Sequence, residues 1–459
     1  MLLNHYEESL IRNNHLPAEW QTQSDLDELS DFLQQNWEQR SVFYNDGEIT
    51  TRQQFLGFSG QRAIRTKNYI GTISFKGHQL NIFPKVFRTE RDDNDTSDLT
   101  TKHLMRNLVQ WLQQCRAIDY PYIQVQSQLE DSTDLRELFI TLYIRYVKNA
   151  LDRGLFYQYE ECTEDCSVIK GRVDFKDYFV RKYPNGQMDK FKCTYSSFEF
   201  DNMLNRIIKC TCKSLLNSVS GENQKVIRRI LMKLNEVSDM RCSPFDCDKV
   251  RLTRFHKHYA AVLSMSKMFL LNKVTNFASD NTESFCFLFP TEVLFEGFIG
   301  GFMQDVLREE AMVRLQASEM SLISSMEYDG ESLGKAFAMR HDILIEHRQK
   351  GVFVLDTKYK QLTRFEGNEE LKATVTKEVS QSDLYQVIEY AANRGLKDAY
   401  LLYPMYRYED EEPQPVHLIR NTVTGDTIRV HIIRLPFVFE DDIDETKRKL
   451  TKVIKEIVA

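Results

Sequence analysis

The sequence predicts an α/β protein in which a C-terminal mixed sheet flanked by helices follows a β-rich N-terminal domain and a mainly helical middle region. Two observations predict this class. From residue 285 onward, a helical pattern is followed by a strand hairpin, a second helix and a further strand. Between residues 135 and 273, apolar residues recur at helical spacing, as at Leu138, Leu142, Tyr146 and Leu151.

The length of the chain predicts several domains. A chain of 459 residues exceeds what one core usually supports, so we divide it at 1–125, 126–275 and 276–459. The first of these contains a polar helix at 25–37 and then short strands separated by Gly and Asn turns. The polar run 90–98 lacks apolar anchors and is therefore predicted to be an exposed loop.

Turn and strand signals place the later elements. Tyr-Pro-Asn-Gly at 183–186 predicts a turn within the helical middle region. In the third domain, 399–404 is predicted to be a core strand, and 416–420 with 428–435 a hairpin. The amphipathic stretch 447–458 is predicted to be a closing helix.

A first hairpin in this domain carries the candidate chemistry. Its predicted strands are 339–346 and 352–359, joined by the polar turn 347–351. Side chains alternate along a strand, so Asp356 and Lys358 point the same way, and the hairpin can bring Asp342 close to them. Two aspartates and a lysine placed in this way can bind a hard cation and position a water molecule beside it. A cation and a positioned water are the least that hydrolysis of a phosphodiester requires.

The alternative reading is that Asp-x-Lys is an ordinary solvated strand face, which is the commoner meaning of this pattern. Two features favour a site. Asp356 interrupts the apolar run 352–355, and buried strand ends rarely carry unpaired acids. Asp342 also occurs at hairpin distance from it.

This arrangement resembles the PD-(D/E)xK nuclease superfamily, and the wider chain resembles the McrC family, the nuclease subunits of McrBC-type modification-dependent (5-methylcytosine) restriction systems. In the superfamily an acid on a preceding helix joins the metal site, and Glu296 matches it. Gln386 and Tyr390 match a Gln-x-x-x-Tyr pattern on a later helix, and residues four apart share one helix face. Their alternative reading is a polar helix edge packed on the sheet.

Weaker motifs extend the resemblance over most of the chain in order. They are the strand pair 69–73 and 80–85, the segments 135–139, 153–155 and 171–172, and the pair Asp201 and Asn205. One residue departs from the pattern, because His341 replaces the proline of the superfamily name. That proline does no chemistry, so its loss weakens the resemblance more than it threatens activity.

The resemblance implies a restriction-endonuclease-like domain and a Mg²⁺-dependent DNA endonuclease of the type IV restriction kind. Asp342, Asp356 and Glu296 would hold the metal, for which Mn²⁺ would serve as well. Lys358 would orient the attacking water and stabilise the developing negative charge.

Three residues would support this chemistry. The Thr357 carbonyl could be a backbone ligand of the metal, while Gln386 and Tyr390 would position the phosphate or brace the acids. Signals for the start and end of a helix agree with this placement. Ser380 or Ser382 would cap the helix that carries Gln386 and Tyr390, and Gly395 would end it.

The expected partner is a nucleotide-driven motor. The chain contains no Gly-x-x-x-x-Gly-Lys-[Ser/Thr] loop, so it should not hydrolyse nucleotide itself. The resemblance implies an McrB-like AAA+ GTPase ring that binds the GTP, with methylated DNA as substrate. The N-terminal domain would dock on that ring, and Arg62, Arg65 and Lys85 are candidate contacts on charge grounds. The formal net charge of −7 fits a subunit that is brought to DNA by another protein.

The remaining composition places the chain in the cytoplasm. The nine cysteines lack ligand-like spacing and are expected to be free thiols in a reducing compartment. No signal peptide is indicated, and no run of about eighteen apolar residues predicts a membrane span.

Two other functions remain open. The chain could be a non-catalytic activator or scaffold of the GTPase ring, its acids being a remnant of the fold. It could instead be a free-standing DNA repair nuclease. The presence of Glu296, Asp342, Asp356 and Lys358 together argues against the first, and the long platform before residue 276 argues against the second.

Overall fold

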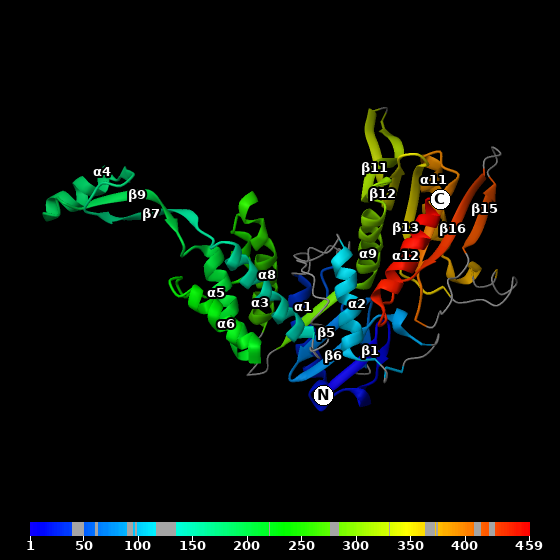
Figure 1. Cartoon of the computed structure of the whole chain (residues 1–459), viewed down its shortest axis with the longest axis horizontal. Helices are drawn as coiled ribbons and strands as arrows, with labels where there is room; N and C mark the ends of the chain where they lie inside the picture. The colour runs from blue at the N-terminus through cyan, green and yellow to red at the C-terminus, as the bar shows by residue number, and fades with distance from the viewer. Residues whose placement is uncertain are drawn as a thin grey trace. The chain divides into compact units, whose positions relative to one another are not determined.

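The computed structural model describes residues 1–38, 50–59, 63–89, 95–96, 99–115, 135–219, 221–275, 284–329, 331–362, 372, 375–407, 415–421 and 427–459. The chain forms two compact units, which we describe separately (Figure 1). The first consists of Met1–Tyr120, Gln126–Leu135 and Asn281–Ala459, and the second of Pro121–Val125 and Arg136–Asp280. The division into three domains at 125 and 275 stays a prediction.

A six-stranded mixed sheet dominates the C-terminal part of the first unit, in the order β11-β12-β13-β14-β16-β15. Its strands are β11 (Ala311–Tyr328), β12 (Glu331–His347), β13 (Gly351–Thr357), β14 (Asp398–Pro404), β15 (Val416–Asn421) and β16 (Thr427–Leu435). The strands β13, β14 and β16 run parallel, and the other pairings are antiparallel. The predicted α/β class with its mixed sheet is confirmed.

The predicted hairpins are present, but the analysis of the sequence missed one strand of this sheet. β12 and β13 pair as expected, and β15 pairs with β16. β11 was not predicted; it pairs with β12 along most of its length, and the joined ends of the two strands project beyond the sheet (Figure 1). Its sequence mixes polar and apolar residues on two largely exposed faces, so it lacks the alternation typical of a half-buried strand.

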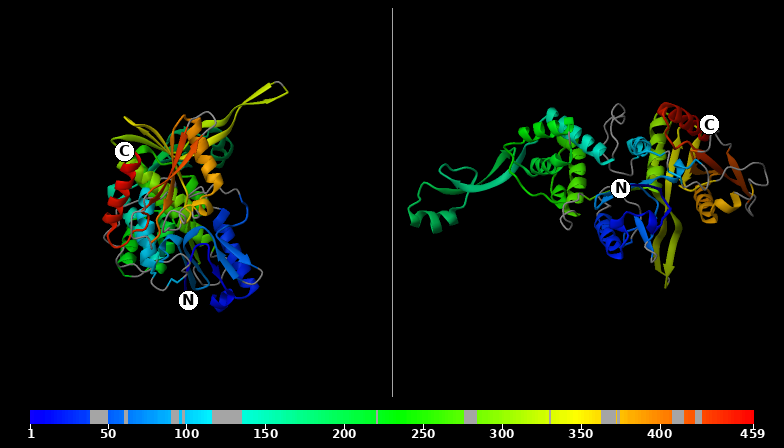
Figure 2. Two further views of the ribbon diagram at one scale, coloured as in Figure 1. Left: turned by 90° about the vertical axis from the view of Figure 1, so that its right-hand side faces the viewer. Right: turned by 90° about the horizontal axis from the view of Figure 1, so that it is seen from below.

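Three helices flank this sheet: α9 (Thr291–Val306), α11 (Gln381–Asn393) and α12 (Ile443–Ile457). α11 buries Val387 and Ala391 against Leu401 and Val430 of the sheet. α12 lies on the other side of the sheet and also contacts α9 (Figure 2). All three helices correspond to helical patterns in the sequence, and they cover the apolar faces that strands buried on both sides require.

The N-terminal strands belong to the same unit. β1 (Leu2–Tyr6), β5 (Tyr69–Phe75), β6 (His78–Phe83) and β10 (Phe285–Pro290) form one sheet, and β2 (Leu10–Ile11), β3 (Leu56–Ser59) and β4 (Ala63–Thr66) form another. β10 comes from far along the chain and pairs with β5. The pairing is close at Gly71, where a Cβ atom would lie 2.0 Å from the Phe287 carbonyl oxygen and where φ is +137°.

β10 was also missing from the prediction. All six of its residues are buried, and a short apolar run of this kind cannot be distinguished from a helical segment by periodicity. The helices of this part are α1 (Gln23–Glu38), which confirms the predicted helix at 25–37, and α2 (Thr101–Gln114). The predicted loop 90–98 lies mostly outside the described residues.

The second unit is mainly helical, as predicted. Its main helices are α3 (Leu135–Arg153), α5 (Met203–Leu215), α6 (Gly221–Lys233), α7 (Pro244–Asp248) and α8 (Ala260–Thr275). Ile207, Cys247 and Leu270 form a core cluster between α5, α7 and α8.

An antiparallel arm interrupts these helices, and the analysis of the sequence missed it. β7 (Gln158–Cys166), β8 (Arg172–Val173) and β9 (Phe191–Glu199) form a three-stranded sheet that extends away from the helices of the same unit (Figure 2). The helix α4 (Phe175–Asp177) and the predicted turn at 183–186 lie between β8 and β9, and Gly186 has a φ of +72°. β7 is polar along both faces, so its sequence does not suggest a strand.

Candidate active site

The two predicted aspartates lie side by side on neighbouring strands of the mixed sheet, where the pairing of β12 and β13 ends. Asp342 is on β12 and Asp356 is near the end of β13, next to the register pair Ile343 and Leu355. The backbone N–H and the side-chain hydroxyl of Thr357 both donate to Asp342 Oδ2, each at 2.9 Å. These two bonds fix the Asp342 carboxylate beside the end of β13. Thr357 thus acts through its N–H and hydroxyl in this structure.

Asp356 is a buried carboxylate whose hydrogen-bonding capacity is incompletely used. Its side chain is 0% exposed, and its Oδ2 lies 2.6 Å from Lys358 Nζ. Among the described residues, Oδ1 has no hydrogen-bond partner. Burial, followed by the nearby charge of Asp342, raises the pKa of Asp356 to about 7. A buried oxygen of this kind is costly unless a cation or a donor satisfies it.

Glu296 reaches the same group from α9. Burial and then the charge of Asp342 raise the pKa of Glu296 to about 8. The Gln316 side chain donates a hydrogen bond to Glu296, and Gln316 has a φ of +53° on β11, just before the register of the β11–β12 pair shifts. Gln316 was not among the predicted residues. Since the unrecognised β11 carries it, no local pattern could have indicated it.

Lys358 and the α11 residues form a hydrogen-bonded chain behind the acids. Lys358 Nζ lies 3.4 Å from Gln386 Oε1, and the Gln386 amide donates to the Tyr390 hydroxyl at 2.7 Å. Tyr390 in turn donates to the Arg340 carbonyl at 2.8 Å. Burial alone would lower the pKa of Lys358, but Asp356 raises it above its ordinary value, so the lysine is held as a cation.

Local sequence explains how α11 is placed. Ser380 caps it by accepting from the Ser382 N–H, and Gly395, with a φ of +65°, follows its end. His341, in the place of the superfamily proline, is 0% exposed. Its Nδ1 lies 3.2 Å from the Ala317 carbonyl oxygen, and its ring centroid is 4.4 Å from that of Tyr390. In this structure His341 therefore packs against the α11 residues.

The residues fit a hard divalent cation. Three carboxylates interact electrostatically, one of them has a buried oxygen without a hydrogen-bond partner among the described residues, and two have raised pKa values that a nearby cation would lower. As the side chains stand, no group of three or more His, Cys, Asp or Glu residues within the described part of the chain is close enough to hold a metal. Asp342, Asp356 and Glu296 are the residues that would hold it.

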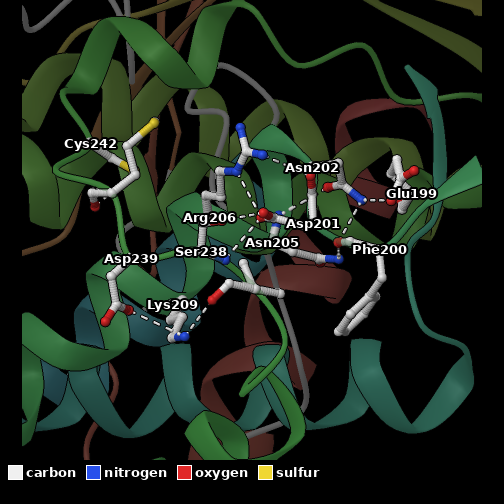
Figure 3. A network of polar contacts seen from close by, with 12 residues as sticks. Glu199, Phe200, Asp201, Asn202, Asn205, Arg206, Lys209, Ser238, Asp239 and Cys242 are labelled. Atoms are coloured by element: carbon white, nitrogen blue, oxygen red, sulfur yellow. Dashed lines mark hydrogen bonds and ion pairs between the residues drawn. The ribbon is translucent and has the colours of Figure 1, made fainter. Parts of the chain in front are cut away.

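The motif pair of the second unit, Asp201 and Asn205, belongs to a network of polar contacts at the start of α5 (Figure 3). Asp201 accepts bonds from the Arg206 side chain at 2.7 Å and from the Ser238 backbone N–H at 3.0 Å. The amides of Asn202 and Asn205 donate to the Phe156 carbonyl, at 3.1 and 2.8 Å. Phe156 lies just before β7, so these asparagines fix the base of the arm to α5.

The N-terminal motif is also built into the fold. β5 and β6 are the predicted strand pair, and Lys85 after β6 is bonded to Glu8 at 3.0 Å. Arg65 is exposed on β4, whereas Arg62 lies outside the described residues. All nine cysteines lie within the described residues, and none of them is in a disulfide. No helix among the described residues is long and apolar enough to cross a membrane.

Comparison with known proteins completes the description. Residues 64–404 match the family model of the McrBC 5-methylcytosine restriction system component. A chain of the refined half-complex from a tetradecameric assembly of Thermococcus gammatolerans McrB AAA+ hexamers with bound McrC is similar, with a TM-score of 0.64 and 16% identity over 99% of this chain and 100% of that chain. The cryo-EM structure of the Thermococcus gammatolerans McrBC complex contains a chain that matches with a TM-score of 0.46 and 18% sequence identity. This match covers 67% of this chain and 88% of that chain. No curated protein sequence matches.

Proposed function

Since the chain belongs to the McrBC family of 5-methylcytosine restriction system components, we propose that it is the endonuclease subunit of such a system. In this proposal it hydrolyses phosphodiesters of methylated DNA with a divalent cation and is activated by a separate AAA+ GTPase. The observation that carries the proposal is the buried Asp356, which has one oxygen without a hydrogen-bond partner among the described residues and which interacts with Lys358, Asp342 and Glu296.

The acids and the lysine have different roles in the proposed reaction. A cation bound by Asp342, Asp356 and Glu296 would polarise the scissile phosphate and lower the pKa of an attacking water. Lys358 carries a fixed positive charge beside Asp356 and stabilises negative charge as it develops on the phosphate. Thr357 fixes the orientation of the Asp342 carboxylate through its two hydrogen bonds.

Gln386 and Tyr390 hold Lys358 in position. Gln386 accepts from the ammonium group and donates to the Tyr390 hydroxyl, which is anchored on the Arg340 carbonyl. Because a long lysine side chain has several rotamers, this chain of bonds limits the positions that its charge can take. The two α11 residues therefore support the reaction without touching the cation.

The partner in this proposal is an McrB-like AAA+ GTPase ring, which would bind the GTP. The similar structure from Thermococcus gammatolerans is described as McrB AAA+ hexamers with bound McrC, and this chain lacks a phosphate-binding loop of its own. The N-terminal domain stays our candidate for docking, with Arg65 and Lys85 as candidate contacts. We add the arm of the second unit, because it exposes large apolar side chains, including Tyr159 (70% exposed), Phe179 (62%) and Phe198 (57%).

A plasmid-cleavage experiment tests the proposal. Methylated and unmethylated plasmids are incubated with Mg²⁺ and the purified chain, with and without the candidate GTPase and GTP, beside an Asp356→Ala variant. We expect cutting that requires the GTPase, GTP and methylation and that disappears in the variant. Cutting by the chain alone would favour a free-standing repair nuclease. Stimulated GTP hydrolysis without cutting under any condition would favour the scaffold function.

A further inference from the structure

We propose that Glu7 is a positioning residue for the candidate active site, joining the N-terminal sheet to the two segments that carry Glu296 and Lys358. Glu7 directly follows β1 and is far from these residues in the sequence. The inference rests on the proposed nuclease function and goes beyond it, because it makes the N-terminal sheet part of the structure that shapes the site.

Glu7 is buried and its carboxylate is fully engaged. The side chain is 0% exposed. Oε1 accepts from the Lys85 backbone N–H at 2.9 Å and from the Tyr359 hydroxyl at 2.7 Å, and Oε2 accepts from the Thr291 hydroxyl at 2.6 Å. One carboxylate therefore joins the ends of β1 and β6 to two later segments of the chain.

Both later segments lead directly to residues of the candidate active site. Thr291 is the first residue of α9, and Glu296 follows on the same helix after about 7.5 Å of helical rise. Tyr359 is the neighbour of Lys358 in the chain, and the Lys358 backbone N–H donates to the Leu402 carbonyl at 2.8 Å. Fixing Thr291 and Tyr359 to one carboxylate therefore restricts how far Glu296 and Lys358 can move relative to each other.

A carboxylate suits this position because all three of its partners are donors. An amide in place of Glu7 would present its NH₂ group to at least one of them and leave a buried donor unpaired. Lys85 balances the buried charge: its Nζ lies 4.9 Å from the Tyr359 ring centroid and pairs with Glu8 at 3.0 Å. Among the described residues, Glu7 makes its side-chain hydrogen bonds to Lys85, Thr291 and Tyr359 and not to the acids or Lys358, so its effect on the site would be indirect.

The test uses the full chain with its GTPase partner and compares Glu7→Gln, Thr291→Val and the conservative Thr291→Ser. Asn107→Ala is the matched control, because Asn107 is a buried residue of the same unit whose amide bonds the Phe439 backbone in both directions. The readouts are kcat and KM for methylated DNA, the melting temperature, and Mn²⁺ affinity measured from the free-ion EPR signal.

We expect Glu7→Gln and Thr291→Val to lower kcat or Mn²⁺ affinity about 10- to 100-fold, the usual effect of removing a residue that orients a metal ligand. KM for DNA should stay nearly unchanged, and Thr291→Ser should restore activity. Asn107→Ala should lower the melting temperature without changing kcat or Mn²⁺ affinity. If Glu7→Gln and Thr291→Val behave like Asn107→Ala, Glu7 only stabilises the fold and the inference is overturned.

The Mn²⁺ readout separates this inference from the proposed function. A wild-type complex that binds Mn²⁺ but never cuts would refute the nuclease function, and the positioning role would still stand if Glu7→Gln weakened the binding. A wild-type chain that neither cuts nor binds Mn²⁺ would overturn both, since there would be no cation site to position.

Discussion

Asp201 and Asp356 are aspartates of the same chain in opposite electrostatic situations. In the second unit, Asp201 bonds to Arg206 and Ser238, and these bonds, Arg206 first, lower its pKa to about 2 (Figure 3). In the first unit, Asp356 pairs with Lys358 and has one oxygen without a hydrogen-bond partner in the described part of the chain, and burial raises its pKa to about 7. Both residues were singled out by motifs, and only their surroundings distinguish them.

The comparison shows how a functional acid differs from a structural one. A structural carboxylate gains its partners when the chain folds, so the folded state favours its charged form. A carboxylate that awaits a cation is left incompletely satisfied, at a cost in stability that the fold elsewhere must offset. The predictions below test this contrast, from the largest expected effect to the smallest.

The largest effect should follow from neutralising each acid in turn. Asp356→Asn should lower the cutting rate about a thousandfold or more, equal to roughly 4 kcal/mol of transition-state stabilisation, and leave the fold intact. Asp201→Asn should destabilise the second unit by about 0.5–1.5 kcal/mol, because the partly exposed donors of Arg206 and Ser238 lose a charged acceptor. Cutting rates per folded molecule and urea melts of both variants check this. Equal losses of stability in the two variants would remove the contrast.

A smaller effect is expected at the lysine. Lys358→Met keeps the length of the side chain but removes the charge beside Asp356, so the cutting rate should fall about a hundredfold through lost electrostatic stabilisation. The variant should still fold. Single-turnover rates on methylated DNA measure the effect, and a rate within about threefold of the wild type would show that Lys358 is only a structural partner of Asp356.

The third prediction concerns pH. In the folded protein the pKa of Asp356 is about 7 and that of Glu296 is about 8, and both values lie above those in the unfolded chain. In the absence of a cation, the first unit should therefore lose stability as the pH rises from about 4 to about 8. Mn²⁺ affinity should rise over the upper part of this range as the acids ionise. The pKa of Asp201 is shifted in the opposite direction, so the stability that this carboxylate gives to the second unit is present above about pH 4 and is lost as the pH falls towards 2. Thermal melts and Mn²⁺ titrations across pH measure both trends.

The smallest effect should come from α11. Tyr390→Phe removes the hydroxyl that joins Gln386 to the Arg340 carbonyl. One such bond is worth about 1 kcal/mol, so the cutting rate should fall roughly fivefold. Mn²⁺ affinity should not change, because Tyr390 does not contact the cation site. A change in affinity as large as the change in rate would contradict this separation.

Local patterns were enough to predict much of the protein. The short apolar segments of β12 and β13, the polar turn between them and the interrupting Asp356 predicted the hairpin and its acids. Side-chain spacing predicted α9 and α11, and the caps of α11 predicted its ends. These features are encoded within a few residues, where periodicity and turn chemistry act directly. The membership of the McrBC family followed from the order of such motifs along the chain.

Only the tertiary structure decided the long-range arrangement. It pairs β10 with β5, brings Gln316 to Glu296, and places Glu7 against Thr291 and Tyr359. As far as the structure describes the chain, it also leaves one oxygen of Asp356 without a hydrogen-bond partner, while Asp201 accepts bonds from Arg206 and Ser238. Each of these facts depends on which distant segments share a layer. The sequence by itself determined which residues carry charge and which local elements they sit on, but burial and the neighbours of each carboxylate depend on packing across the whole unit, which no local pattern records.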